Sequence, residues 1–515
     1  MHTHPALGQV PAAVAHAFGE RYDSPVPLAL FLLGGAAVVL VSFALVYRRE
    51  VASALTSDGT APTPVDDVTL AAPGPVAPAV SVVLLVLLSL AGLLGSQTVA
   101  ENILPVTFWI VVWVVAPLAV GLVGDFTGPI NPFAAIARAT DREAVRRTVL
   151  GGPALEWPKR LGYWVFAVLY LLVVFGELIV NGTATLPRVI AVALLTYGII
   201  CAAGGLVFGA AAWNRHAELF TVLFATWGRL GWFRFGAPGR RGLGGGLAAP
   251  FDPSLSRLVG VLLLLVSVSF DGLLSTPQWA RALGGLPAGV QNGTAGYVVL
   301  TTTIMIGLTV AMLAVFGGFA AGAARAGGFS TLQAHGVRGL ALTGLLPSLL
   351  PIAFAYLLAH YLQYVLIQGQ LLLPLIGNPI GSDSWPIHLP FPFNDSYEVN
   401  TGIMPTSVVW YVQIVVIVVA HVLAVVLAHR HLGSQTTDIA RARRSEWPWL
   451  VAMVGYTMLS LWLLAQPLQA EAKPADSTAS ASAGVGVGAG SVAAMLSNAG
   501  VGPGSVAAAA SVAVR

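Results

Sequence analysis

The chain is short of charge. Of its 515 residues only 9% are Asp, Glu, Lys or Arg, while 56% are hydrophobic and the mean hydropathy is +0.81. A soluble domain needs a charged surface, so this composition excludes a water-soluble globular protein. Cysteine is almost absent too, because Cys201 is the single one. One cysteine excludes an intramolecular disulfide and a thiolate metal cluster.

Long apolar runs take the place of charge. A helix needs about 20 apolar residues to cross a hydrocarbon core about 30 Å thick. Ten runs in this chain come close to that length, and they predict an all-α, polytopic transmembrane helical bundle over residues 27–470. The predicted spans lie near residues 27–47, 77–97, 103–125, 161–180, 186–212, 255–275, 295–320, 342–371, 406–429 and 447–468.

Basic residues are distributed unequally between the connections that join these runs. When the connections are assigned alternately to two sides, only five of the 25 Lys and Arg residues fall on one side: Arg21, Arg188, Arg281, Lys473 and Arg515. The positive-inside rule makes the arginine-rich side cytoplasmic, so both termini are predicted to lie outside the plasma membrane. We therefore expect the arginines to face an anionic lipid bilayer and to bind no nucleic acid.

The segments outside the spans differ in character. Residues 1–26 lack the basic-then-apolar order of a signal peptide and are predicted to be an external segment. Residues 471–515, almost wholly Ala, Gly, Ser and Val, predict a disordered low-complexity tail. Residues 213–254 contain an apolar run too short to span, which predicts an interfacial or re-entrant helix. Residues 372–405 are acidic and rich in proline, and we expect them to cover the outer mouth.

Polar side chains within the eighth span are the first candidates for function. Tyr356, His360 and Gln363 follow one another at i, i+4 and i+7, so they share one face of a helix. A charged side chain at the centre of a membrane helix costs on the order of 2.5–3.5 kcal/mol. Such residues are therefore expected to serve a function or a helix contact.

The ninth span carries a second set of polar side chains, Trp410, Gln413 and His421. At 1.5 Å per residue, His360 lies roughly 18 Å and His421 roughly 22 Å from the outer ends of their spans. The two imidazoles are thus predicted at nearly the same depth in neighbouring helices. They would suit a divalent metal ion, a haem or proton transfer, or they would simply bond neighbouring helices.

Asp271 lies near the outer end of the sixth span, and Glu177 lies at a similar level in the fourth. Both acids either face a polar site or mark where their helices leave the bilayer. We predict Asp271, His360 and His421 as catalytic residues, and the two histidines as metal ligands. The residues predicted to line the substrate site or path are Tyr356, Gln363, Trp410 and Gln413.

Several short blocks of this sequence are similar to a known family. These blocks are Ala15-His16 to Arg21 with Asp23 and Pro25-Val26-Pro27, Trp213 to Glu218, Ser269-Phe270-Asp271-Gly272 with Trp279, Pro351-Ile352-Ala353 with Tyr356 and Ala359-His360-Tyr361, and Trp410-Tyr411-Val412-Gln413 with Ala420-His421 and Ala428-His429. They resemble the fenitrothion hydrolase-like family of multi-pass prokaryotic membrane proteins. The resemblance implies a membrane location and a hydrolase of lipophilic esters. The chain has Asn378-Pro379-Ile380-Gly381 where the family is expected to have Asp-Pro-Phe-Gly.

Three functional hypotheses follow. The first is a membrane-embedded hydrolase in which Asp271, His360 and His421 hold a metal or act as a general base. The second is a membrane transporter or channel component, in which the same residues line a path. The third is a haem-binding or accessory membrane subunit.

The predicted threading is tested by labelling an introduced cysteine on intact cells with a membrane-impermeant maleimide, after Cys201→Ala has removed the native thiol. A cysteine placed between residues 138 and 160 should stay unlabelled until the cells are permeabilised, because this arginine-rich connection is predicted to be cytoplasmic. A cysteine between residues 372 and 405 should react at once. Labelling of the 138–160 position on intact cells would reverse the orientation.

Overall fold

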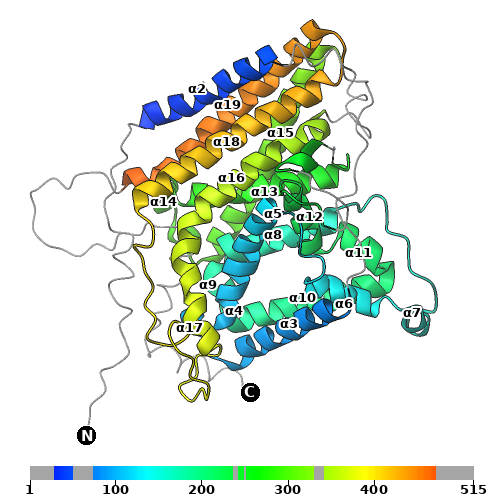
Figure 1. Ribbon diagram of the computed structural model, residues 1–515, viewed down its shortest axis with the longest axis vertical. Coiled ribbons are helices and arrows are strands. Elements are labelled where there is room, and N and C mark those ends of the chain that lie inside the picture. Colours follow the sequence, from blue (N-terminus) through cyan, green and yellow to red (C-terminus); the bar gives the residue numbers. More distant parts are fainter. Residues whose placement is uncertain (1–27, 50–73, 236–241, 249–250, 330–340, 471–515) are drawn as a thin grey trace, which may run out of the picture.

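The computed structural model describes residues 28–49, 74–235, 242–248, 251–329 and 341–470. Every regular element in this part of the chain is helical, in agreement with the predicted fold class. Figure 1 shows these helices packed into one elongated bundle. The predictions for residues 1–26, for the tail at 471–515 and for the family-like block at 15–27 fall outside the described residues.

The helices of the bundle follow the predicted runs closely. They are α2 (Leu28–Arg49), α3 (Val76–Leu94), α4 (Ile103–Pro105), the π-helix η4 (Val106–Val115), α5 (Ala116–Val123), α6 (Pro132–Thr140), α7 (Glu143–Leu150), α8 (Trp164–Leu178), α9 (Asn181–Ala184), α10 (Pro187–Phe208), α11 (Ala210–His216), α12 (Leu219–Gly228), α13 (Leu255–Leu274), α14 (Pro277–Gly284), α15 (Ala295–Gly327), α16 (Leu342–Gln368), α17 (Leu372–Gly377), α18 (Thr406–Gly433) and α19 (Ile439–Ala470). The 3-10 turns are η3 (Val99–Glu101), η5 (Gly245–Ala248), η6 (Ala288–Val290) and η7 (Gly369–Leu371).

Among the described residues, eight helical segments are long and apolar enough to cross a membrane. They begin at α3, α4, α10, α13, α15, α16, α18 and α19, so the chain has the features of a multi-pass membrane protein. The two other predicted spans are helical as well, but α8 has only 15 residues and the apolar part of α2 covers Leu32–Val41. The count of ten spans and the sides of the termini stay predictions.

The helices form two groups that meet around α16. In Figure 1, α2, α19 and α18 run side by side along one edge, and α3 and α10 run along the opposite edge. Between them α16 packs on α13 and α18. The apolar window of α16 is 94% buried, whereas that of α15 is only 17% buried. We conclude that α16 is the central helix and that most of the apolar window of α15 lies on the surface of the bundle.

The helical conformation is interrupted at Ala217 and Glu218, which lie between α11 and α12. The Glu218 carboxylate caps α12 by accepting hydrogen bonds from the backbone nitrogens of Phe220 and Thr221, at 3.2 and 2.7 Å. All of α12 except Thr221 is buried within the protein. The helix α12 is thus an inner helix of the protein, and the interfacial or re-entrant position of this run in the membrane stays a prediction.

The segment that follows α17 lies against the ends of α3 and α4. Its carbonyl oxygens at Pro379 and Ile380 accept hydrogen bonds from the backbone nitrogens of Ile103 and Ser96, at 3.0 and 2.8 Å. Gln370 accepts from the Tyr397 hydroxyl at 2.8 Å and so ties the segment to the end of α16. Residues 372–405 therefore cover one end of the bundle, as a lid would.

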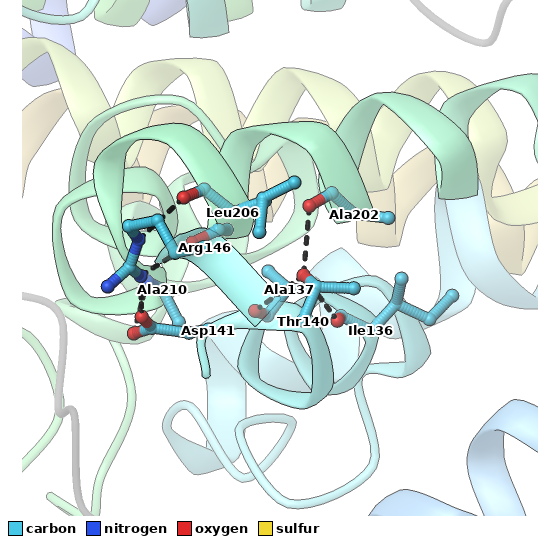
Figure 2. A network of polar contacts seen from close by, with 9 residues as sticks. Ile136, Ala137, Thr140, Asp141, Arg146, Ala202, Leu206 and Ala210 are labelled. Atoms are coloured by element: carbon cyan, nitrogen blue, oxygen red, sulfur yellow. Dashed lines mark hydrogen bonds and ion pairs between the residues drawn. The ribbon is translucent and has the colours of Figure 1, made fainter. Parts of the chain in front are cut away.

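A polar network holds the ends of α6, α7 and α10 together (Figure 2). Nε of Arg146 donates to the carbonyl oxygen of Leu206 at 2.7 Å, and the same guanidinium forms an ion pair with Asp141. Asp141 in turn accepts a hydrogen bond from the backbone nitrogen of Ala210 at 2.8 Å. Thr140 donates to another carbonyl of α10 at 2.8 Å. The network gives hydrogen-bond partners to the carbonyl oxygen of Leu206 near the end of α10 and to the backbone nitrogen of Ala210 at the start of α11. Such groups at helix ends have no partner within their own helix.

Arg146→Met should lower the free energy of unfolding by about 3 kcal/mol, because the substitution removes the ion-pair partner of Asp141 and leaves the carbonyl oxygen of Leu206 without its donor. Arg147→Met is the matched control. The Arg147 side chain is 72% exposed and pairs only with Glu143 one turn away, so this control should cost less than about 0.5 kcal/mol. Unfolding in detergent, followed by circular dichroism, measures both. Equal losses would show that the network adds no particular stability.

A candidate proton-exchange site

Three helices bring ionisable side chains together near the level where α8 and α13 end. Glu177 is one residue before the end of α8, and Asp271 is three residues before the end of α13. His360 and Tyr361 lie past the middle of α16, the helix that packs on α13. Asp271 is only 1% exposed and Glu177 only 5%. Both acids are thus buried within the bundle and do not simply mark helix ends.

The hydroxyl of Tyr361 bridges the two acids. It lies 2.7 Å from Oε1 of Glu177 and 2.9 Å from Oδ2 of Asp271. The same Oδ2 of Asp271 lies 2.7 Å from Nε2 of His360. A continuous line of hydrogen bonds therefore joins Glu177, Tyr361, Asp271 and His360.

The bridging geometry has a consequence for the protons of the site. A tyrosine hydroxyl carries one hydrogen and can accept through its lone pairs, whereas an ionised carboxylate can only accept. Tyr361 can therefore donate fully to one of the two acids only. The second contact becomes a hydrogen bond when that acid is protonated and donates to Tyr361. The arrangement suits a proton that is shared along the line, as in other paired acids.

Aromatic side chains enclose the Glu177 end of the line. Nε1 of Trp113, from the π-helix η4, donates to the other carboxylate oxygen of Glu177 at 2.7 Å. The indole also packs on Tyr170, whose hydroxyl is 2.8 Å from Oγ of Ser267. A cavity of about 20 Å³ lies among these residues, and it is large enough for roughly one water molecule.

The His360 end is more open and is shaped by its neighbours on α16 and α18. The His360 side chain is 19% exposed. Tyr356, one helical turn earlier, stacks on its ring with centroids 6.2 Å apart and planes 11° apart. Gln413 on α18 donates to the carbonyl oxygen of Ala359 at 2.7 Å and fixes α18 beside this turn. Tyr356 and Gln413 therefore both lie beside the His360 turn, and their role in lining a substrate site or path stays a prediction.

The other predicted site residues lie apart from this line. His421 has no hydrogen bond to Asp271 or His360, and its Nδ1 donates to the Ile417 carbonyl of its own helix at 2.8 Å. Trp410 is buried against Tyr411, and Gln363 is half-buried and takes no part in the line. Within the described ranges no group of three His, Cys, Asp or Glu side chains could hold a metal ion. The metal-ligand role of His360 and His421 stays a prediction without geometric support.

Sequence reasoning missed two members of the site. Tyr361 entered only as part of a family-like block, and Trp113 was not singled out. An apolar span with a tyrosine beside a histidine carries no signal of a bridge, because the partner acids come from other helices. Glu177 does carry a signal in the sequence, because an acid inside a membrane span is costly and therefore a candidate for a functional site.

Another buried carboxylate, Glu218, has a structural role. Its two oxygens also accept hydrogen bonds from Tyr197 at 2.8 Å and Asn131 at 2.6 Å, besides the backbone groups of α12. The side chain is 0% exposed. Burial lowers the pKa of the nearby Arg138, and the charge of Glu218 opposes that shift. Because its oxygens already accept so many donors, Glu218 holds α6, α10 and α12 together.

Comparison adds no relative. No family model, no curated protein and no solved structure matches this chain. The resemblance to the fenitrothion hydrolase-like family therefore stays a prediction. What is established is an all-helical, multi-pass membrane protein whose described core holds a hydrogen-bonded line of Glu177, Tyr361, Asp271 and His360.

Proposed function

We propose that this protein is a membrane transporter that moves protons along Glu177, Tyr361, Asp271 and His360. The single observation that carries the proposal is the Tyr361 hydroxyl between two carboxyl groups, at 2.7 and 2.9 Å, with His360 on the second of them. Ionisable residues inside membrane spans are costly, and chains of Asp, Glu and His mark proton relays in pumps and transporters.

The line supports a balanced transfer. A proton on Glu177 passes to Oη of Tyr361 while the hydroxyl's own proton passes to Asp271, so the tyrosine ends unchanged. Asp271 then gives its proton to Nε2 of His360, provided that the neutral imidazole carries its hydrogen on Nδ1. His360, whose side chain is 19% exposed, releases the Nδ1 proton and ends as the other tautomer, and it returns to the Nδ1–H tautomer before it accepts the next proton.

The space around the line favours protons over a bulky substrate. The cavity beside Glu177 and Tyr361 holds roughly one water molecule, whereas sites for small molecules usually enclose on the order of 300–1,000 Å³. Ser267, the serine that lines this cavity, bonds to Tyr170 and Leu264 and not to His360. It is therefore not placed as a nucleophile activated by that histidine.

Proton flux into proteoliposomes that enclose a pH-sensitive dye tests the proposal. Tyr361→Phe removes only the bridging oxygen, so it should lower the flux on the order of a hundredfold, the scale of a lost proton-transfer group. Tyr364→Phe is the matched control, because Tyr364 is only half-buried on the same helix and contacts the Tyr361 ring without a hydrogen bond to either acid. Its flux should equal that of the wild type.

Glu177→Gln and Asp271→Asn should reproduce the loss, since each amide keeps the shape of the acid but cannot take up and release a proton near neutral pH. Size-exclusion profiles of all variants check that they fold. A wild-type protein that conducts no more protons than empty liposomes would refute the proposal. Undiminished flux in Tyr361→Phe would refute the route.

A hydrolase remains the second candidate, on one specific observation. Asp271 holds Nε2 of His360 at 2.7 Å, the arrangement in which a buried acid orients a general base, and the His360 side chain is 19% exposed. On this hypothesis membranes that contain the protein should hydrolyse a lipophilic phosphotriester, and His360→Ala should abolish the turnover. Identical rates in membranes with and without the protein would remove the hydrolase.

A further inference from the structure

Two buried polar atoms close to the site have no hydrogen-bond partner among the described residues. They are the hydroxyl oxygen of Tyr356 and Nε2 of His421. Tyr356 is 2% exposed and His421 is 1% exposed, so bulk solvent does not reach either side chain. A buried polar group left without a partner costs about 1–3 kcal/mol. Such atoms in a native protein usually bind an ordered water or an ion.

Tyr356 connects this region to the proton line. Its ring stacks on His360, and its hydroxyl is close enough to Asp271 and Tyr456 for a charge on either of them to act on it. A Cβ atom built on Gly272, the residue after Asp271, would lie 2.5 Å from the Tyr356 hydroxyl. A glycine at this position therefore leaves room for the hydroxyl beside α13.

His421 faces the same region from α18. Its ring centroid is 6.4 Å from that of Tyr456 on α19, and the Tyr456 hydroxyl is 2.7 Å from Oγ of Ser269, two residues before Asp271. Because Nδ1 contacts a carbonyl oxygen, which can only accept, Nδ1 carries the hydrogen. Nε2 is then a bare lone pair, ready to accept a proton or a hydrogen bond.

We propose that ordered water binds at Tyr356, Tyr456 and His421 and extends the proton relay inward from His360. The inference rests on the proposed proton transport and adds the groups that carry the proton next after His360. Tyr356 precedes His360 by one turn on α16, so the extension leads away from the predicted outer side. Farther along α18, Nδ1 of His429 lies 2.9 Å from Oε1 of Glu446, and these two ionisable groups give the relay a place to continue toward.

The step at His421 is a simple proton exchange. A water that carries an excess proton gives it to Nε2, so that an N–H bond forms as an O–H bond breaks and neutral water remains. The Nδ1–H bond to Ile417 is kept, and the imidazolium returns the Nε2 proton to water in the reverse step. The tyrosine hydroxyls hold the water by hydrogen bonds and need not ionise.

Proton flux in proteoliposomes tests this extension with two substitutions. Tyr356→Phe and His421→Gln should each lower the flux roughly a hundredfold, because one removes the water-binding oxygen and the other the titrating nitrogen. Tyr411→Phe is the control, since Tyr411 lies on α18 with 53% of its surface exposed. Its flux should match the wild type.

The outcomes separate this inference from the proposed function. If Tyr361→Phe blocks the flux while Tyr356→Phe and His421→Gln leave it intact, the proposed transport stands and the inward extension is wrong. If the wild-type protein conducts no protons, the proposed function fails first.

The bound water has a readout that does not depend on transport or on any variant. Radiolytic hydroxyl labelling of the wild-type protein oxidises side chains next to bound water. Tyr356 and His421 should be modified well above Phe166, which is 0% exposed and lies in the apolar core. Modification of both residues at the level of Phe166 would rule out the water and with it the extension.

Discussion

The structure depends on how a low-dielectric bundle accommodates two carboxyl groups side by side. Glu177 and Asp271 come from different helices and are nearly inaccessible to solvent. Two bare carboxylates so close together would repel each other strongly. The Tyr361 hydroxyl between them, the Trp113 indole on Glu177 and the His360 imidazole on Asp271 supply the hydrogen bonds that make their burial tolerable. Those same contacts arrange the groups as a line along which a proton can move.

The central helix explains why these groups meet. Most of α16 is buried, so most of its side chains face other helices. Pro347 and Pro351 lie inside α16 and remove two backbone donors from its ladder. Membrane helices tolerate such prolines where neighbouring helices pack around them. The packing of α13 and α18 on α16 then sets Asp271 and Gln413 beside the His360 turn.

Much of the fold could be read from the sequence, because hydropathy alone sets which segments can cross a bilayer. The predicted runs at 77–97, 186–212 and 255–275 became α3, α10 and α13 with ends shifted by only a few residues. Asp271 and His360 were identified by their cost inside apolar helices, and the structure joins them. The structure shows no contact that would support the predicted pairing of His360 with His421, which was based on their equal depth in the membrane. Equal depth does not specify which way two side chains point.

What the sequence by itself determined is an all-helical membrane chain, its approximate helix positions and the polar residues that burial makes costly. Tertiary structure alone decided that Tyr361 would stand between Glu177 and Asp271, that Trp113 would close the site and that His421 would face Tyr456. The reason is physical. Hydropathy is a property of one segment, whereas a hydrogen bond between helices requires a relative rotation and height that only the packing of the whole bundle fixes.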